Sequence, residues 1–250
     1  MGNVDHFYHF LFGLFLPFLV SQKKFLLQRS YQFPDLGPMN RHLEWLSELG
    51  MNLEVVYQKE IETDGLFEIS CAGWDHPSAY QFAEFELARD TLFGLMKFSK
   101  PTPNLEPRVL IIERGLAMYD HRAKSTTNGV LRRSIPNLSD LCSQLSPFVG
   151  LELAILEEVS LKDQIQLFAT ADIVVAQHGA SLANLVWCKP GAWVIEVIDP
   201  KPRAPFFKKL AHRLSLNYIS IPQANNHAEI DIDSVASIIL KKCSEYTNLL

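Results

Sequence analysis

The sequence has few cysteines, and no two of them are close together. Four occur in 250 residues, at Cys71, Cys142, Cys188 and Cys243. A C-x-x-C pair would indicate a zinc site, and a closely spaced even set would indicate a disulfide framework; neither is present. This spacing argues against a small disulfide-stapled or zinc-binding protein and favours a reducing compartment.

An excess of positive charge is also missing. With 23 Lys and Arg against 28 Asp and Glu, the formal net charge is −5. A broad nucleic-acid surface needs a basic field, so we expect no nucleic-acid partner. The pairs Arg132-Arg133 and Lys208-Lys209 are local exceptions that can bind small anions.

The apolar run at residues 7–20, FYHFLFGLFLPFLV, is too short to cross a membrane. It has about fourteen residues, whereas a spanning helix needs roughly 20. A signal peptide would open on a positive segment, but Asp5 and His6 precede this run. We therefore predict a buried helix, no transmembrane segment, and an N-terminal domain that is short or truncated.

The proline-rich stretch KPTPNLEP, at residues 100–107, is the best candidate for a linker. It predicts an N-terminal α/β domain at 1–104 and a C-terminal domain at 105–250. In the first domain the patterns predict, after the first helix, strands at 24–28 and 52–57 and helices at 41–49 and 77–98.

Strands and helices alternate regularly in the second domain. The predicted strands are 109–112, 151–156, 173–176, 193–198 and 217–221, and the predicted helices are 138–145, 161–171, 181–187, 205–214 and 232–246. This alternation indicates parallel strands joined by crossovers, and continuous apolar runs such as IVVA indicate that both sheet faces are covered. We predict a doubly wound α/β domain.

Polar residues follow the strand at 173–176, where ligands sit beyond the carboxyl ends of parallel strands. Gly179 permits a tight turn and a close backbone approach, and the helix that begins there offers free N–H groups to an anion such as phosphate. His178 and Ser181 add donors, with Asn184 one turn further on. Alternatively, Gly179 only turns the chain and Ser181 only caps the helix.

The stretch HGASLANLVWCKPGAWVIEV at residues 178–197 resembles the signature of glycosyltransferase family 61. That signature has H-G-A-x-L-x-N-L, a P-G loop and an I-E strand. The preceding LEEVSLKDQIQLFATADIVVAQ is similar to a helix of the family with an internal Gln and an Ala-Asp pair before the strand. RVLIIERG resembles its first C-domain strand, ending at Arg114. Members of the family also have a basic pair after the polar loop, which Arg132-Arg133 resembles. Through His9 and Pro17, the N-terminal run resembles an H-F-x-x-D-x-x-x-P helix.

The resemblance implies a GT-B architecture, with two Rossmann-like domains and the donor held mainly by the second. It implies an inverting enzyme that moves a sugar from a nucleotide-sugar, commonly UDP-N-acetylglucosamine or UDP-xylose, to a glycan or protein hydroxyl. No essential metal or other cofactor is implied, and the sequence has no DxD motif. Bacterial members work in the cytoplasm and eukaryotic ones in the secretory lumen. We expect a cytoplasmic, membrane-associated protein, with the Golgi or ER lumen as the alternative.

Donor-binding roles follow from this chemistry. Arg114, Arg132 and Arg133 would neutralise the leaving diphosphate because guanidinium forks match phosphate oxygens, and the amides of Gly179, Ala180 and Ser181 would assist. Glu196 ends an apolar strand and needs a partner. That partner is either a hydroxyl of the ribose or sugar, or a neighbouring arginine.

The base that takes the proton of the acceptor hydroxyl is less well marked. The family pattern has an acid four residues after His9, where this sequence has Gly13. His9 itself is a candidate base, because histidine exchanges protons near neutral pH. Asp5 or His6 could take its place. Equally, His9 is a core histidine of an apolar helix.

Two other functions compete with the transferase. Gly179-Ala-Ser181-Leu-Ala183 approximates a nucleophile elbow, with Asp199 and His212 or His227 following in the order of a serine hydrolase. A degenerate transferase that binds a nucleotide without turnover would account for Gly13.

Overall fold

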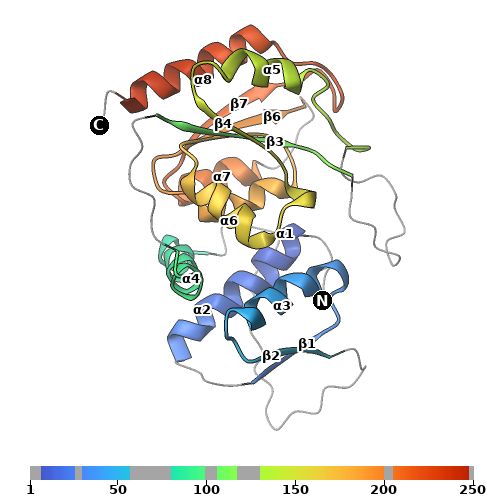
Figure 1. The fold of residues 1–250 in the computed structure, drawn as a ribbon, viewed down its shortest axis with the longest axis vertical. Helices are drawn as coiled ribbons and strands as arrows, with labels where there is room; N and C mark the ends of the chain where they lie inside the picture. The colour runs from blue at the N-terminus through green and yellow to red at the C-terminus, as the bar shows by residue number, and fades with distance from the viewer. Residues whose placement is uncertain are drawn as a thin grey trace. The chain divides into compact units, whose positions relative to one another are not determined.

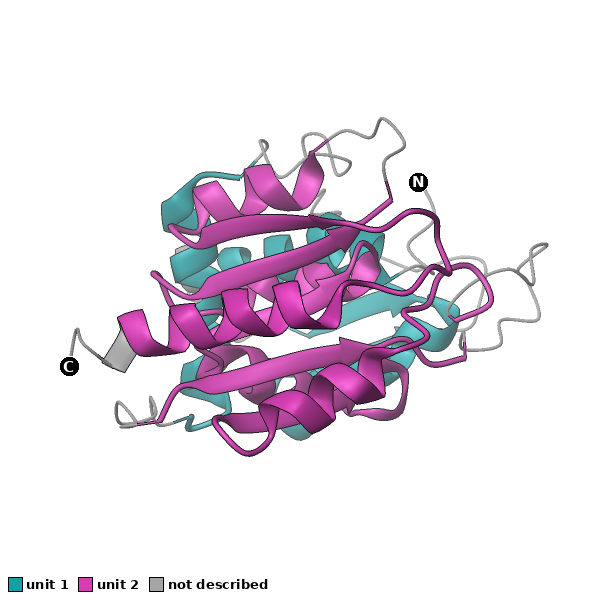
Figure 2. Cartoon of the chain, turned by 90° about the horizontal axis from the view of Figure 1, so that it is seen from above, with its two compact units in different colours: residues 1–99 teal, residues 100–250 magenta. Residues whose placement is uncertain are grey.

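A computed structural model of the chain describes residues 7–25, 30–56, 80–98, 106–116, 130–199 and 205–247. The chain divides into two compact units, residues 1–99 and 100–250, which are coloured separately in Figure 2. The predicted boundary after residue 104 falls in a stretch, 99–105, that lies outside the described residues.

Unit 1 is mainly helical in its described part. Its elements are α1 (Phe7–Phe10), the π-helix η1 (Leu11–Phe15), α2 (Leu16–Phe25), β1 (Tyr31–Pro34), the 3-10 helix η2 (Gly37–Met39), α3 (Asn40–Glu48), β2 (Leu53–Val56) and α4 (Phe82–Leu95). The predicted helix at 41–49 and strand at 52–57 are confirmed. The strand predicted at 24–28 is wrong where it can be checked, because residues 24–25 continue α2. β1, which pairs in parallel with β2, was not predicted.

The helix predicted over residues 7–20 is present, but a π-helix interrupts it. Leu16 donates its N–H to the carbonyl of Leu11, five residues back. With the same five-residue spacing, the carbonyl of Phe12 would accept a hydrogen bond from the N–H of residue 17. That residue is Pro17, which has no N–H. The hydroxyl of Tyr80 donates to the Phe12 carbonyl instead. The side chain of Tyr80 therefore satisfies a carbonyl that the helix cannot.

Unit 2 alternates strands and helices as predicted. Its elements are β3 (Arg108–Glu113), α5 (Leu138–Leu145), β4 (Gly150–Ile155), η4 (Leu156–Glu158), α6 (Leu161–Thr170), β5 (Ile173–Gln177), η5 (Ala180–Trp187), β6 (Trp193–Ile198), α7 (Phe206–Arg213), β7 (Asn217–Pro222) and α8 (Ile232–Thr247). Ser160 caps α6 through its Oγ, which accepts from the N–H of Asp163 at 3.2 Å. The helix after β5 is a 3-10 helix rather than an α-helix.

The strands of unit 2 form one parallel sheet in the order β4-β3-β5-β6-β7. In chain order this is 2-1-3-4-5, a doubly wound arrangement whose strand order reverses between β3 and β5. Figure 1 shows α5 and α8 on one side of the sheet and α6 and α7 on the other. Both faces are therefore covered, which explains the continuous apolar strands.

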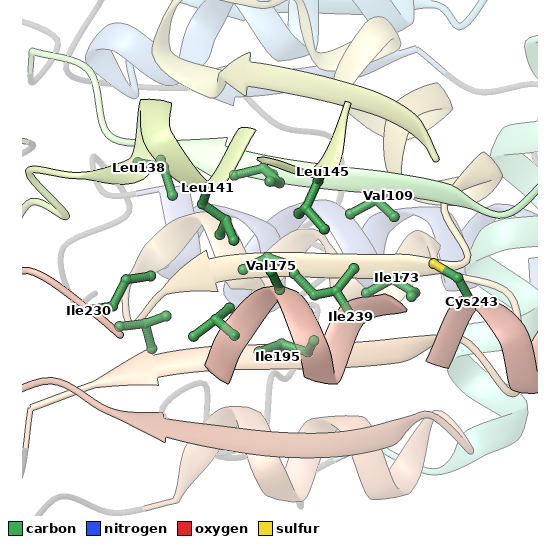
Figure 3. Packing of buried hydrophobic residues seen from close by; sticks show 14 residues of the cluster. Val109, Leu138, Leu141, Leu145, Ile173, Val175, Ile195, Ile230, Ile239 and Cys243 are labelled. Carbon is green, nitrogen blue, oxygen red and sulfur yellow. The ribbon is translucent and has the colours of Figure 1, made fainter. Parts of the chain in front are cut away.

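One hydrophobic core cluster of unit 2 lies between the sheet and the α5–α8 layer. Figure 3 shows side chains of β3, β5 and β6 meeting those of the two helices. Alternate residues contribute on each strand, Val109 and Ile111 on β3 and Ile195 and Val197 on β6. Because side chains alternate across a sheet, Glu196 points to the opposite face, where α7 lies.

Asp172 and Lys189 stabilise the amino end of the sheet. One carboxylate oxygen of Asp172 accepts the N–H of Arg108 at 2.8 Å, and the other pairs with the Lys189 ammonium. Asp172 is almost fully buried. The Ala-Asp pair before β5 and the lysine of the K-P-G loop thus hold β3, β5 and the turn before β6 together.

Gly191 occupies a turn that only glycine adopts easily, with φ of +84°. Its N–H donates to Ser215, and its carbonyl accepts from Asn217. Gly191→Ala should destabilise unit 2 by about 1–2 kcal/mol, the cost of a left-handed alanine. Urea denaturation measures this loss. Gly150→Ala is the control, because its Cβ would meet its nearest neighbour, the Pro107 carbonyl oxygen, at an ordinary 3.6 Å. An equal loss in both variants contradicts the argument.

Candidate functional site

The polar residues predicted after β3 and β5 lie at the reversal of strand order. Ile112 pairs with Ala176, so Arg114 and His178, each two residues further on, leave the sheet at the same level. In open parallel sheets this reversal is where ligands bind, because the loops on its two sides diverge and leave a crevice.

Two arginines converge on one backbone carbonyl at this point. The guanidinium of Arg114 donates to the carbonyl of His178 at 3.3 Å, and that of Arg133 donates to the same oxygen at 3.2 Å. Arg133 is buried and Arg132 is exposed. Burial lowers the pKa of Arg114, the charge of Glu157 opposes this effect, and the charge of Arg132 adds to it. The site therefore concentrates positive charge in a partly desolvated place.

Gly179 leaves space for one of these arginines. A Cβ at this position would lie 2.2 Å from Nη1 of Arg114. The backbone of Gly179 is extended, with φ 168° and ψ 179°, so any residue type could adopt it. The chain turns here, since the Gly179 carbonyl accepts the N–H of Leu182 at 3.0 Å, but the turn does not require a glycine. The predicted close approach to the backbone is present, and the approaching group is the Arg114 guanidinium.

His178 is held by a buried carboxylate. Its Nδ1 contacts Oε1 of Glu196, and the hydroxyl of Tyr218 donates to Oε2 of the same carboxylate. Glu196 is 2% exposed. The prediction that an arginine is the partner of Glu196 is wrong, because its two carboxylate oxygens contact His178 and Tyr218. Burial, followed by the hydrogen bond to Glu196 and its charge, raises the pKa of Tyr218, which stays a donor.

A pair of buried amides ties three loops together beside the arginines. Nε2 of Gln177 donates to the carbonyls of Ser134 and Asn226, both at 3.1 Å, and to Oε1 of Gln223 at 2.6 Å. Nε2 of Gln223 donates to Ser134 as well. Because Ser134 follows Arg133 and Gln177 precedes His178, this network fixes the backbone on both sides of the charged site.

Asn184 lies deeper than the other predicted donor-binding residues. Its Nδ2 donates to Gln164 at 3.0 Å, and its Oδ1 accepts from the Trp187 indole at 3.1 Å. Asn184 is fully buried, whereas Ala180 is exposed and Ser181 is half-buried. Its contacts thus join η5 to α6, and its donor-binding role stays a prediction.

The predicted bases belong to unit 1. His9 lies in α1, half-buried, with its ring edge-on to Tyr8. Gly13, which replaces the acid of the family pattern, lies within η1. Asp5 and His6 lie outside the described residues. The catalytic roles of all three candidates stay predictions.

The contacts of Ser181 do not resemble those of a serine hydrolase. Its Oγ is buried, and within the described part of the chain it makes no hydrogen bond to a histidine or any other group. His227 pairs with Ser134 instead, Nδ1 to Oγ at 3.0 Å. Ser181 also lacks the positive φ of a strained nucleophile elbow.

A family model matches most of the chain. The model of the family described as glycosyltransferase 61 matches residues 7–195, three quarters of the chain. The chain therefore belongs to the glycosyltransferase 61 family. The match includes the helices at the N-terminus as well as Arg114, Arg133 and His178.

Two curated relatives are plant enzymes. The chain is 26% identical over 167 residues to the beta-1,2-xylosyltransferase RCN11 of Oryza sativa, and 30% identical over 81 residues to a beta-1,2-xylosyltransferase of Arabidopsis thaliana. These segments cover 64% and 32% of this chain. They span 30% and 15% of the relatives' own lengths, so the chain matches only part of each enzyme.

None of the described helices is both long enough and apolar enough to pass through a lipid bilayer.

Proposed function

We propose that this protein is an inverting glycosyltransferase with a UDP-linked donor, and that it transfers the sugar to a glycan or protein hydroxyl. Transfer of a pentose is favoured by the names of the two relatives, both xylosyltransferases. The observation that carries the proposal is the convergence of Arg114 and Arg133 on the His178 carbonyl at the reversal of strand order.

The chemistry of the reaction needs positive charge at this place. The oxygen of the acceptor hydroxyl forms a bond to C1 of the sugar as the bond from C1 to the diphosphate oxygen breaks. The diphosphate leaves with the electron pair, and a base takes the hydroxyl proton. Fixed guanidinium groups stabilise the charge that develops on the leaving group, since they need no rearrangement as the reaction proceeds. We therefore propose a metal-independent reaction.

The 3-10 helix η5 adds donors to the same site. Its first N–H groups have no acceptor within the helix, because each would need a carbonyl that precedes it. They begin at Ala180, beside the position that Arg114 covers. In a GT-B enzyme of this class, unit 2 supplies the Rossmann-like domain that binds the donor, and unit 1 supplies the acceptor side.

A thermal-shift panel tests the donor class. Saturating UDP, near 100 times its Kd, should stabilise the protein by about 2.7 kcal/mol and raise its Tm by about 5–10 °C, whereas GDP and CMP should not. Arg114→Ala should cut the stabilisation by UDP to about 0.4–1.4 kcal/mol, because a 10–100-fold loss of affinity leaves UDP at only about 1–10 times its Kd. Arg108→Ala, an exposed arginine at the other end of β3, should keep the full shift. A full shift in Arg114→Ala would refute this donor site.

Turnover distinguishes an active enzyme from a degenerate one. Purified protein is incubated with UDP-xylose or UDP-N-acetylglucosamine and a glycan acceptor, and UDP release is measured. Product formation supports the transferase. UDP binding with no release across a donor panel supports a nucleotide-binding protein that has lost its base at Gly13.

A further inference from the structure

The hydrogen-bonded chain Tyr218–Glu196–His178 contains a residue that sequence patterns did not single out. Tyr218 lies on β7, beyond residue 195, where the family match ends. On the neighbouring strand, Glu196 pairs with Ser220, so Tyr218 is its diagonal neighbour on the same face. Its hydroxyl reaches the carboxylate that holds His178.

The carboxylate decides which nitrogen of His178 carries a proton. An ionised carboxylate only accepts hydrogen bonds, and here its two oxygens face two donors, the Tyr218 hydroxyl and Nδ1–H of His178. The proton of the neutral ring therefore stays on Nδ1. Nε2 points away from Glu196 and makes no hydrogen bond within the described residues, and the side chain is 15% exposed. Nε2 is thus the nitrogen open to a ligand.

We propose that Tyr218 and Glu196 are positioning residues that make His178 take up a proton at Nε2 when a nucleoside diphosphate binds. The protonated ring then lies between two anions, the Glu196 carboxylate and a phosphate oxygen, and donates one hydrogen bond to each. When the ring of His178 is protonated, its positive charge compensates the buried charge of the Glu196 carboxylate, which otherwise contacts two neutral donors. The inference rests on the proposed function, because it assigns a diphosphate to this site.

The described groups around His178 come from several parts of unit 2. Glu196 comes from β6 and Tyr218 from β7, and Arg114 and Arg133 donate to the carbonyl of His178. The ring of Phe207, from α7, packs edge-on against the imidazole with centroids 5.3 Å apart. Glu196 is the negative charge in contact with the ring and favours its protonation. The charges of Arg114 and Arg133 oppose it, and a diphosphate bound at the two arginines would cancel their charge.

Calorimetry of UDP binding in buffers of different ionisation enthalpy tests the proton uptake. The wild-type protein should take up as much as one proton per UDP, and its Kd should rise by up to about tenfold per pH unit at alkaline pH. Glu196→Gln should remove the uptake and weaken binding by about 10–100-fold, by analogy with partners that orient a metal-binding histidine. Tyr218→Phe should reduce both, by about three- to tenfold in Kd.

The double variant separates positioning from a structural role. If Glu196 acts through His178, Glu196→Gln should change Kd by no more than about twofold when His178→Gln is already present. Additive losses would overturn the proposal. Tyr31→Phe is the matched control for Tyr218→Phe and should bind UDP normally. Its hydroxyl, in unit 1, is buried and makes no hydrogen bond within the described part of the chain.

The tautomer of His178 can be measured without any nucleotide. Nitrogen-15 NMR of the wild-type protein at alkaline pH should show the proton on Nδ1. Tyr218→Phe should leave the proton on Nδ1, because the Glu196 carboxylate still only accepts hydrogen bonds, whereas Glu196→Gln should shift the population towards Nε2–H. A wild-type ring with its proton on Nε2 overturns the proposal even if UDP binds. Failure of wild-type protein to bind UDP refutes the donor class instead, while the tautomer still reports on Glu196.

Discussion

Gly179→Ala is expected to weaken UDP binding by about 10–100-fold, since one charge-assisted contact of about 1.5–3 kcal/mol is lost. The added Cβ would lie 2.2 Å from Nη1 of Arg114. The clash is with the end of a flexible side chain, so the guanidinium moves away and the fold stays intact. Because the backbone at 179 is extended, alanine adds no strain of its own. Calorimetry with UDP and thermal unfolding without it measure the two effects.

Two further variants show whether the loss comes from Arg114. Gly179→Ala combined with Arg114→Ala should bind UDP no more weakly than Arg114→Ala alone, within about twofold, because the clash has no partner once the guanidinium is gone. Gly150→Ala, which makes only an ordinary contact, should bind normally. Wild-type affinity in Gly179→Ala, or additive losses in the double variant, would contradict the role given to this glycine.

Unit 1 should lose stability as the pH falls below 6.5, because of His42 on α3. The ring is 2% exposed and packs on Phe7 and Phe10, and its Nε2 makes no hydrogen bond within the described residues. Burial, with a smaller effect from Arg41, lowers the pKa of His42 to about 3. Between pH 6.5 and about 3 the unfolded chain binds a proton at this residue that the folded chain does not.

The sign of this effect is fixed by that difference in bound protons. Above pH 6.5 the ring is neutral in both the folded and the unfolded state, so it does not make the stability depend on pH. Between pH 6.5 and about 3, the free energy of unfolding falls by about 1.4 kcal/mol per pH unit. Hydrogen exchange of α3 amides at pH 7, 6, 5 and 4 follows the loss in unit 1 alone. His42→Phe keeps an aromatic ring against Phe10 and has no proton to gain. The stability of His42→Phe should therefore fall less steeply with pH than that of the wild type, by this slope. Parallel curves for the two proteins would contradict the assignment.

The second unit could be predicted largely from the sequence. Apolar runs such as IVVA and WVIEV have the length and β-branched content of buried strands, and Ser160 with Asp163 is a local cap that needs no tertiary information. These signals lie within a few residues of each other, so the elements at 138–145 and 193–198 have the predicted bounds. Arg114 and His178 could be placed together because the carboxyl ends of parallel strands meet at one edge, whereas Arg132 and Arg133 were singled out as a basic pair.

What could not be predicted depends on neighbours far apart in the chain. The π-helix at residues 11–15 needs the hydroxyl of Tyr80, which comes from another part of unit 1. The partners of Glu196 depend on the pairing register of β6 with β7, which no pattern within either strand specifies. Alternation shows that Tyr218 and Ser220 share a face, but not which of them reaches Glu196.

The pairing of Ile112 with Ala176 has a practical consequence for anyone who produces this protein. Arg114 and His178 are separated by 64 residues, and they meet only if β3 and β5 are aligned correctly. Sliding one strand by a single residue would send one of the two side chains to the opposite face. Capacity to capture UDP would then serve as an assay of correct assembly. It would expose misaligned preparations that circular dichroism, which detects only total strand content, would pass as native.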